Sequence, residues 1–326
     1  MRTPLTIASS AAVWRDGTPT ESKAYGRALL ELAKGDPRIV CLGADLTGPT
    51  ETDLFRDQLP ERFFNLGIAE ANLMCVASGM ARTGDIPFVN TFGVFATRRS
   101  FDQVALQIAY PRANVKLVGF MPGLTSPGGP THQAIDDVTL MRSLPGMVVV
   151  EPACASHVAP LLAQLVAHHG PAYMRIKRGD LPKLFTADSL PPIGRAQVVR
   201  RGRDGWILAS GVMVTLAIEA LEALAAQGIE AGLVNFTTVK PLDVTVVREL
   251  AASGKPLLVA ENHSIIGGLG SAVAEVIAEA GIAARFTRLG VNDVFAEGAS
   301  APYLFHTYGL SPAAIAKRFA ALAAQN

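Results

Sequence analysis

Short apolar runs alternate along this chain with stretches of helical periodicity, and the alternation restricts the fold more than any other feature. Before residue 184, the apolar runs that read as strands fall at 38–43, 62–65, 87–90, 115–120, 147–151 and 173–176. Good helix formers lie between them, for example at 23–34 and 158–167. Strands and helices that alternate at this spacing form a parallel sheet covered on both faces. The sequence therefore predicts an α/β fold.

A second and smaller unit of the same kind follows a polar, proline-containing segment at 184–194. Its predicted strands are 206–209, 231–235, 256–261 and 285–289, and its predicted helices are 214–227, 244–252, 271–280 and 312–324. A chain of 326 residues is long enough for two domains. We therefore predict one domain over 1–190 and a smaller α/β domain over 191–326.

Composition excludes several functional classes. The 29 Lys and Arg residues nearly balance 28 Asp and Glu, which gives no basic surface for nucleic acid. The apolar run at 8–13 is too short to span a membrane and is a poor secretory signal. Cys41, Cys75 and Cys154 lie too far apart for a zinc site or a disulfide framework. We expect a cytoplasmic protein with reduced, mostly buried thiols.

Glu70 is the first candidate functional residue. It follows a turn at Gly67 and falls in the first turn of a helix that continues to Ala81. The apolar residues of that helix recur with the spacing of one buried face, at Leu73, Val76, Ala77 and Met80. A carboxylate near a helix N-terminus can also be a simple dipole partner, so position alone leaves both interpretations open.

Further candidates follow the predicted strands, where ligands bind in doubly wound sheets. Asp45 lies in the polar loop after 38–43, and His132 lies in the turn-rich loop 123–133. Phe92 and Phe95 are three residues apart, in a segment, 91–104, that we expect to open another helix. Each has an ordinary alternative: Asp45 suits a turn, and the two phenylalanines suit a core.

A glycine-rich turn at 267–270 follows a strand and opens a helix, which resembles half of a dinucleotide-binding fingerprint. The acidic residue expected about 20 positions later is missing. Close packing of the helix against the strand explains these glycines equally well.

Taken together, these motifs resemble those of transketolases. The shared segments, in the order and approximate spacing of that family, are Gly67-Ile68-Ala69-Glu70, Thr91-Phe92 with Phe95, Asp102-Gln103, Gly129-Pro130-Thr131-His132-Gln133 and Glu261-Asn262-His263-Ser264. The resemblance covers about 21–320 and corresponds to the C-terminal half of a full transketolase, the pyrimidine-binding domain and the small last domain. It implies that a separate N-terminal subunit supplies the diphosphate- and metal-binding domain, as in split transketolases.

The resemblance implies a thiamine diphosphate-dependent enzyme that transfers a two-carbon ketol unit from a ketose to an aldehyde. Mg²⁺ would be bound mainly by the partner subunit, in an α2β2 heterotetramer. Glu70 would be the acid that binds the aminopyrimidine ring, and burial raises the pKa of a carboxyl enough for it to hold a proton. Ile68, Asp45, Phe92 and Phe95 would be the other cofactor contacts.

The resemblance also assigns substrate contacts. His132 would bind hydroxyls and move protons. Arg178 would bind the anionic end of the substrate, since a guanidinium suits phosphate, sulfonate or carboxylate alike, and Arg98 is a weaker candidate. The chain departs from the family at Phe120, where a histidine is usual, and at Gly128, where an aspartate is usual. We interpret these two differences as signs of a less polar substrate pocket. Such a pocket would suit a specialised donor or acceptor, such as a non-standard sugar or a 2-oxo acid.

Two other interpretations compete with this one. The same two-domain plan occurs in the beta subunit of 2-oxo acid dehydrogenases and in pyruvate-using acyl-transfer enzymes. A non-catalytic regulatory relative is the third. The Pro-Thr-His-Gln loop and Asp102-Gln103 favour the transketolase interpretation.

Overall fold

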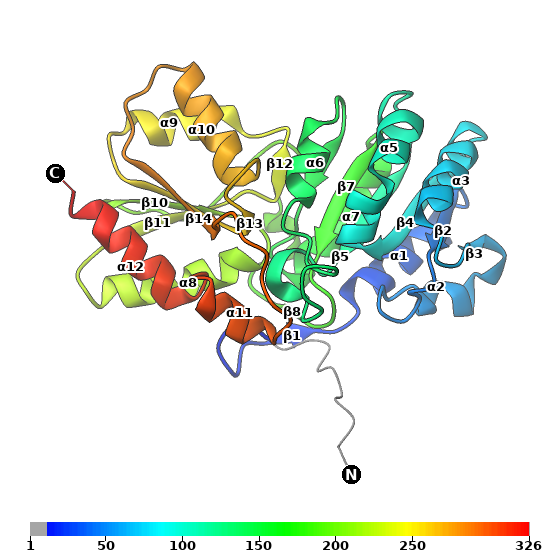
Figure 1. Cartoon of the computed structure of the whole chain (residues 1–326), viewed down its shortest axis with the longest axis horizontal. Helices are drawn as coiled ribbons and strands as arrows, with labels where there is room; N and C mark the ends of the chain where they lie inside the picture. The colour runs from blue at the N-terminus through cyan, green and yellow to red at the C-terminus, as the bar shows by residue number, and fades with distance from the viewer. Residues whose placement is uncertain (1–11, 326) are drawn as a thin grey trace, which may run out of the picture.

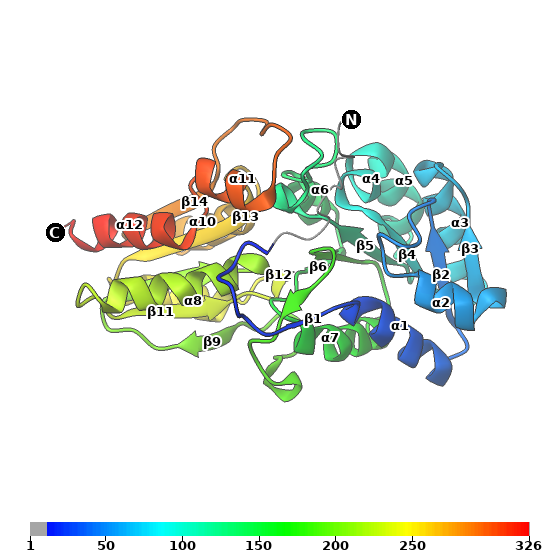
Figure 2. The ribbon, with the colours of Figure 1, turned by 90° about the horizontal axis from the view of Figure 1, so that it is seen from below.

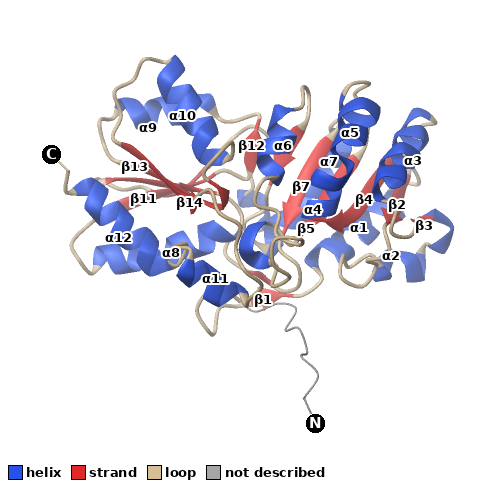
Figure 3. Cartoon of the chain, viewed as in Figure 1, coloured by secondary structure: helices blue, strands red, loops and turns tan. Residues whose placement is uncertain are grey.

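The computed structural model describes residues 12–325, and these form two α/β units that lie side by side (Figure 1). Each unit has a central sheet with helices on both faces (Figure 3). The predicted fold class is confirmed. Positions 8–11 of the apolar run at 8–13 lie outside the described residues.

The first sheet has seven strands in the order β12-β6-β7-β5-β4-β2-β3. Six of them come from the first 190 residues and run parallel: β2 (Ile39–Gly43), β3 (Phe63–Asn65), β4 (Ile86–Phe92), β5 (Lys116–Phe120), β6 (Val148–Val150) and β7 (Ala172–Ile176). Every residue of β2, β4, β5, β6 and β7 is buried. Strands buried on both faces need apolar residues throughout, which is why the sequence shows them as continuous runs.

Helices cover both faces of this sheet (Figure 2). One face packs against α1 (Ala24–Gly35), α2 (Asp53–Gln58) and α7 (Ala155–Ala167). The other packs against α3 (Glu70–Arg82), α6 (Asp137–Ser143) and a π-helical turn over Val104–Ala109. The turn at Gly67 has φ of 70°, a left-handed conformation that glycine adopts without strain. The predicted strand, turn and helix around Glu70 are therefore confirmed.

The segment that follows β4 is helical only in short pieces. It contains α4 (Gly93–Ala96), a 3-10 turn over Arg98–Ser100, α5 (Phe101–Gln103) and then the π-helical turn. The break falls at Thr97, whose φ of −109° and ψ of −83° leave the helical region. The Thr97 hydroxyl donates to the carbonyl of Gly93 at 2.7 Å. The structure therefore has several short helical pieces in this segment and not one continuous helix.

The second sheet has five strands in the order β14-β13-β10-β11-β9. They are β9 (Gln197–Arg200), β10 (Gly205–Ala209), β11 (Ala231–Asn235), β13 (Leu257–Ser264) and β14 (Phe286–Val291), and β9 alone is antiparallel to its neighbour. One face packs against α8 (Val212–Ala225), α11 (Ala301–Thr307) and α12 (Pro312–Ala323). The other packs against α9 (Val244–Ala252) and α10 (Leu269–Glu279) (Figure 1).

Two segments cross between the sequence halves. β12 (Thr238–Lys240) comes from the second half but pairs antiparallel with β6 and extends the first sheet. Near the N-terminus, Trp14 packs into the core of the second unit, while β1 (Thr20–Glu21) pairs with β8 (Leu181–Pro182) of the first. The division at residue 190 remains a prediction. In the structure, each unit also contains a segment from the other side of that boundary: β12 in the first unit and Trp14 in the second.

A buried ionic cluster joins the two units. The Arg175 side chain on β7 is 1% exposed and bonds to the carboxylates of Asp137 at 2.9 Å and Glu151 at 3.3 Å. Its Nη2 donates to the backbone carbonyl of Asn262 on β13 at 3.0 Å, and the Ser210 hydroxyl donates to Glu151 at 2.7 Å. Burial raises the pKa of Glu151, although Arg175 acts in the opposite direction. The cluster therefore depends on Arg175 to balance two buried carboxyls.

No helix within residues 12–325 is both long and apolar enough to cross a membrane. Cys41 and Cys154 are buried as expected, but Cys75 is exposed. The expectation of mostly buried thiols is therefore confirmed, with Cys75 as the exception.

Candidate active site

The predicted site residues lie along one edge of the first sheet. Asp45 follows β2, Glu70 follows β3, Phe95 follows β4, His132 follows β5 and Arg178 follows β7. Because these strands run parallel, their carboxyl ends lie at the same edge. This is the edge at which ligands bind in doubly wound sheets.

Glu70 is the first residue of α3, and its side chain is only 3% exposed. The turn before it is held by Asn65, whose side-chain oxygen accepts from the backbone N–H groups of Gly67 and Asp45, each at 3.1 Å. Asn65 thus joins the loop after β2 to the turn that leads into Glu70. Asn65 was not predicted as a site residue, although an asparagine two residues before a turn glycine favours this side-chain-to-backbone bond.

Arg99 pairs with Glu70 and was also missed. Its Nη1 donates to both carboxylate oxygens of Glu70, at 3.0 and 3.1 Å. The guanidinium carbon of Arg99 lies 4.0 Å from the centre of the Phe95 ring, within the range of a cation–π contact. The Arg99 side chain is 47% exposed. This ion pair differs from the purely apolar surroundings that the sequence around Glu70 indicates.

Phe92, Phe95 and His132 form a cluster of three rings. The rings of Phe92 and Phe95 are nearly parallel, at 25°, with centres 5.9 Å apart. The His132 ring meets both edge-on, 6.2 Å from Phe92 and 5.4 Å from Phe95. The Nδ1 of His132 and the Thr131 hydroxyl are 2.8 Å apart. The structure therefore brings together Glu70, the two phenylalanines and His132 through Phe95 and Arg99.

Gly128 leaves the space that the His132 side chain uses. A Cβ added at Gly128 would lie 2.8 Å from the Cβ and 2.9 Å from the Cγ of His132. Those atoms lie at the root of the side chain and cannot swing away without moving the ring. Any residue larger than glycine at 128 would therefore displace the His132 ring from Phe95.

Arg98 points to the His132 loop and away from Glu70. Its guanidinium donates to the carbonyl of Gln133 at 2.7 Å and pairs with Asp136 at 3.2 Å. The break at Thr97 turns these two consecutive arginines toward different partners. In this structure Arg98 holds the loop that carries His132.

Arg178, Asp45 and Ile68 lie on the same edge with different exposure. Arg178 is half-buried two residues after β7, and burial lowers its pKa. Asp45 is exposed with φ of 61°, and Ile68 is 74% exposed. Next to Arg178, the buried Lys177 amine donates to the backbone carbonyls of Arg178 and Asp180 and so fixes the chain there.

Phe120 does not line the edge. Its side chain is fully buried at the end of β5 and packs edge-on against Tyr25 of α1, with ring centres 5.4 Å apart. A side chain without exposed surface cannot contact a substrate in this structure. The prediction of Phe120 as a substrate contact is corrected accordingly: it belongs to the core beneath the site.

The Phe120→His variant is therefore expected to change stability more than specificity. It places a polar ring among apolar residues, which should lower the free energy of unfolding by about 2–4 kcal/mol. Urea unfolding of this variant and of Phe120→Leu measures the effect, with the smaller loss expected for leucine. A gain in the use of phosphorylated ketoses by Phe120→His, without loss of stability, would show that position 120 reaches the substrate after all.

A side chain of the protein itself, Glu261, binds the backbone N–H groups at the glycine-rich turn before α10. The buried Glu261 carboxylate accepts from the backbone N–H groups of Leu269 at 2.7 Å and Gly270 at 3.1 Å. A Cβ at Gly268 would lie 2.0 Å from the same carboxylate, and burial raises the pKa of Glu261 to about 7. Close packing of strand and helix, the alternative left open by the sequence, thus accounts for these glycines.

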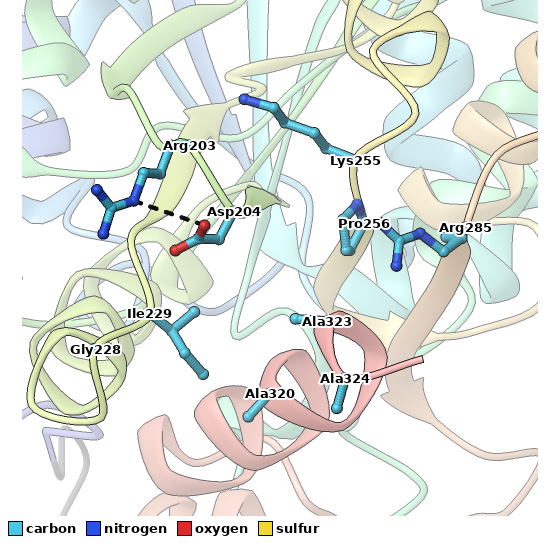
Figure 4. A pocket seen from close by; sticks show the side chains of 10 residues that line it. All are labelled: Arg203, Asp204, Gly228, Ile229, Lys255, Pro256, Arg285, Ala320, Ala323 and Ala324. Atoms are coloured by element: carbon cyan, nitrogen blue, oxygen red, sulfur yellow. Dashed lines mark ion pairs between the residues drawn. The ribbon is translucent and has the colours of Figure 1, made fainter. Parts of the chain in front are cut away.

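A cavity of about 540 Å³ lies elsewhere, near the start of β10 and the end of α12 (Figure 4). Arg203, Lys255 and Arg285 give it a basic lining, but Arg203 lies 3.8 Å from Asp204 and 3.4 Å from Glu230. None of the predicted site residues lines it. Within residues 12–325, no three His, Cys, Asp or Glu side chains gather closely enough to bind a metal ion.

Comparisons with known proteins match both units. Residues 18–183 match the transketolase pyrimidine-binding domain, and residues 194–315 match the transketolase C-terminal domain. The chain is 41% identical to an uncharacterized transketolase family protein of Sinorhizobium fredii, over 94% of this chain and 90% of that protein. It is 42% identical to the 6-deoxy-6-sulfo-D-fructose transketolase subunit SqwH of Clostridium sp., over 88% of this chain and 89% of that protein.

A solved structure is similar over nearly the whole chain. It is described as a split gene transketolase, inactive beta4 tetramer, and it shares 42% identity. The TM-score is 0.86, over 92% of this chain and 97% of that one.

Proposed function

Because this chain belongs to the transketolase family, we propose that it is the C-terminal subunit of a split transketolase that uses thiamine diphosphate and acts only with a partner subunit. The reaction would move a two-carbon ketol unit from a ketose donor to an aldehyde acceptor. The observation that carries the proposal is the cluster of the buried Glu70 carboxyl, the Phe92–Phe95 pair and His132 at one sheet edge.

The residues of this cluster fit the aminopyrimidine half of the cofactor. A flat heteroaromatic ring needs an aromatic surface and a carboxyl that can hold a proton against a ring nitrogen, and Phe95 and Glu70 supply these. When bound, thiamine diphosphate supplies the nucleophilic carbon that attacks a carbonyl and stabilises the resulting charge. Glu70 would hold the proton at the pyrimidine ring, and Ile68 and Asp45 would flank the ring.

His132 and Arg178 would act on the substrate. His132 is half-buried beside Phe95, where its imidazole can bind a substrate hydroxyl and exchange a proton with it. Arg178 would bind a terminal anion. The relative from Clostridium sp. is named for a sulfonated ketose, which supports an anionic ketose as the substrate class here.

The partner subunit would hold the diphosphate and Mg²⁺. The similar split gene transketolase is described as an inactive tetramer of its beta chain, which supports the expectation that this chain alone does not turn over. An α2β2 heterotetramer in the cytoplasm is the assembly that we propose.

Arg178→Ala should raise the KM for an anionic ketose roughly 10- to 100-fold, since hydrogen bonds to charged groups contribute about 1.5–3 kcal/mol. The kcat should change little, because the anion lies away from the reacting carbon. Steady-state kinetics with a phosphorylated or sulfonated ketose and its uncharged analogue measure this. Lys183→Ala is the control, since the ion pair of Lys183 within residues 12–325 is with Glu21, at 3.4 Å. Equal KM changes for the charged and uncharged ketose would rule out the anion-binding role.

Reconstitution tests the proposed function as a whole. The chain would be co-purified with a partner that carries the diphosphate- and metal-binding domain and assayed for two-carbon transfer with thiamine diphosphate and Mg²⁺. Activity is expected only with both subunits present. Carbon dioxide release from pyruvate, without ketol transfer, would instead indicate the 2-oxo acid enzyme, and turnover by the single chain would contradict the split subunit.

A further inference from the structure

We propose that Arg99 is an internal competitor of the cofactor, bound in the free subunit to the two groups, Glu70 and Phe95, that the aminopyrimidine ring must contact. The inference rests on the proposed function of these two residues. It goes beyond that function in assigning a role to a side chain outside the motifs of the sequence.

The contacts of Arg99 are those that the ring would need. One guanidinium nitrogen, Nη1, bonds to both oxygens of Glu70, at 3.0 and 3.1 Å. The guanidinium carbon is 4.0 Å from the Phe95 ring centre, which is van der Waals contact between two flat groups. A second flat group cannot stack on the same face of Phe95, and a pyrimidine nitrogen cannot reach Glu70 along the direction that Nη1 occupies.

Two other rings also contact Phe95. Phe92 lies against it with a nearly parallel ring, and His132 meets it edge-on. A ligand that reaches Phe95 from the side that Arg99 occupies would therefore contact Phe95 and Glu70 together.

Few contacts hold Arg99 in this position. Its side chain is 47% exposed, and among the described residues its guanidinium has hydrogen bonds to Glu70 alone. Because the arginine end of this pair is open to solvent, the pair is weaker than one in which both partners are buried. Arg98, its neighbour, is anchored by Asp136 and the carbonyl of Gln133 and has no such freedom.

Competition predicts tighter cofactor binding when Arg99 is removed. If the cofactor binds only the form in which Arg99 has left Glu70 and Phe95, its apparent affinity equals the intrinsic affinity multiplied by the fraction of that form. With the strength of a half-exposed ion pair and a cation–π contact, Arg99→Ala should lower the Kd for thiamine diphosphate by roughly three- to tenfold.

The test is thiamine diphosphate binding, by titration calorimetry, to the complex with the partner subunit. Arg99→Ala is expected to bind tighter than wild type, Arg99→Lys to lie between them, and Arg82→Ala to match wild type. Arg82 is an exposed arginine at the far end of α3 and serves as the matched control. In a Glu70→Gln background the main partner of Arg99 is neutral, so Arg99→Ala should change the Kd less than about twofold.

Unchanged or weaker binding by Arg99→Ala, with Glu70 intact, would overturn the proposal, as would an equal gain in both backgrounds. Failure of the proposed function is a separate result. If Glu70→Gln keeps full turnover, Glu70 does not activate the cofactor, whatever Arg99→Ala does to the Kd.

Discussion

Glu70→Gln in the reconstituted complex should lower kcat by about 10²- to 10⁴-fold, the range that a positioned acid or base contributes. Glutamine keeps the length and the hydrogen-bonding oxygen of the side chain but cannot hold an acidic proton against the pyrimidine ring. Steady-state turnover with saturating ketose, aldehyde and cofactor measures the change. Glu70→Ala should be at least as inactive.

Glu31→Gln is the matched control for this substitution. Glu31 lies on α1, pairs with Lys34 at 2.8 Å and is exposed, so turnover should remain at the wild-type level. Circular dichroism of both variants establishes that the fold is retained. Wild-type kcat for Glu70→Gln would exclude the acid role and would leave a non-catalytic relative as the better interpretation.

Arg175→Leu should lower the free energy of unfolding by about 3–5 kcal/mol, because removal of one partner leaves buried charges without compensation. Arg175 bonds to Asp137 and Glu151, which are themselves almost fully buried. Its loss also removes the bond to the Asn262 carbonyl, which links the two units. Urea unfolding of the purified chain, followed by fluorescence and circular dichroism, measures the loss.

The control for Arg175→Leu is the same substitution of an arginine in an exposed ion pair. Arg38→Leu breaks the pair of Arg38 with Asp36 at 2.7 Å, in which the arginine is largely exposed, and should cost less than about 1 kcal/mol. A loss for Arg175→Leu as small as that for Arg38→Leu would show that the cluster does not hold the two units together.

Most strands of both sheets could be predicted, because a strand buried on both faces needs a continuous apolar run. β9 was not predicted, since it is only partly buried. β5 and β11 fall within one residue of their predicted bounds. β12 could not be predicted, because its three residues pair with β6 almost 90 positions earlier in the chain. Local patterns carry no information about such distant pairing.

The location of the candidate site residues could be predicted where motif and topology agree. Parallel strands bring Glu70, Phe95 and His132 to one edge, whichever side chains follow them. Arg99 could not be predicted, because its direction depends on the break in the helix at Thr97. Phe120 was misplaced for a related reason: it ends a strand, but Tyr25 of a helix far away in sequence covers it.

The most direct test of the account is a density map of the assembled complex with thiamine diphosphate bound. We predict a Glu70 carboxylate oxygen within hydrogen-bonding distance, about 2.5–3.0 Å, of a nitrogen of the aminopyrimidine ring, with the ring against Phe95 and Arg99 displaced. A map with Arg99 still on Glu70 and the ring bound elsewhere would contradict it.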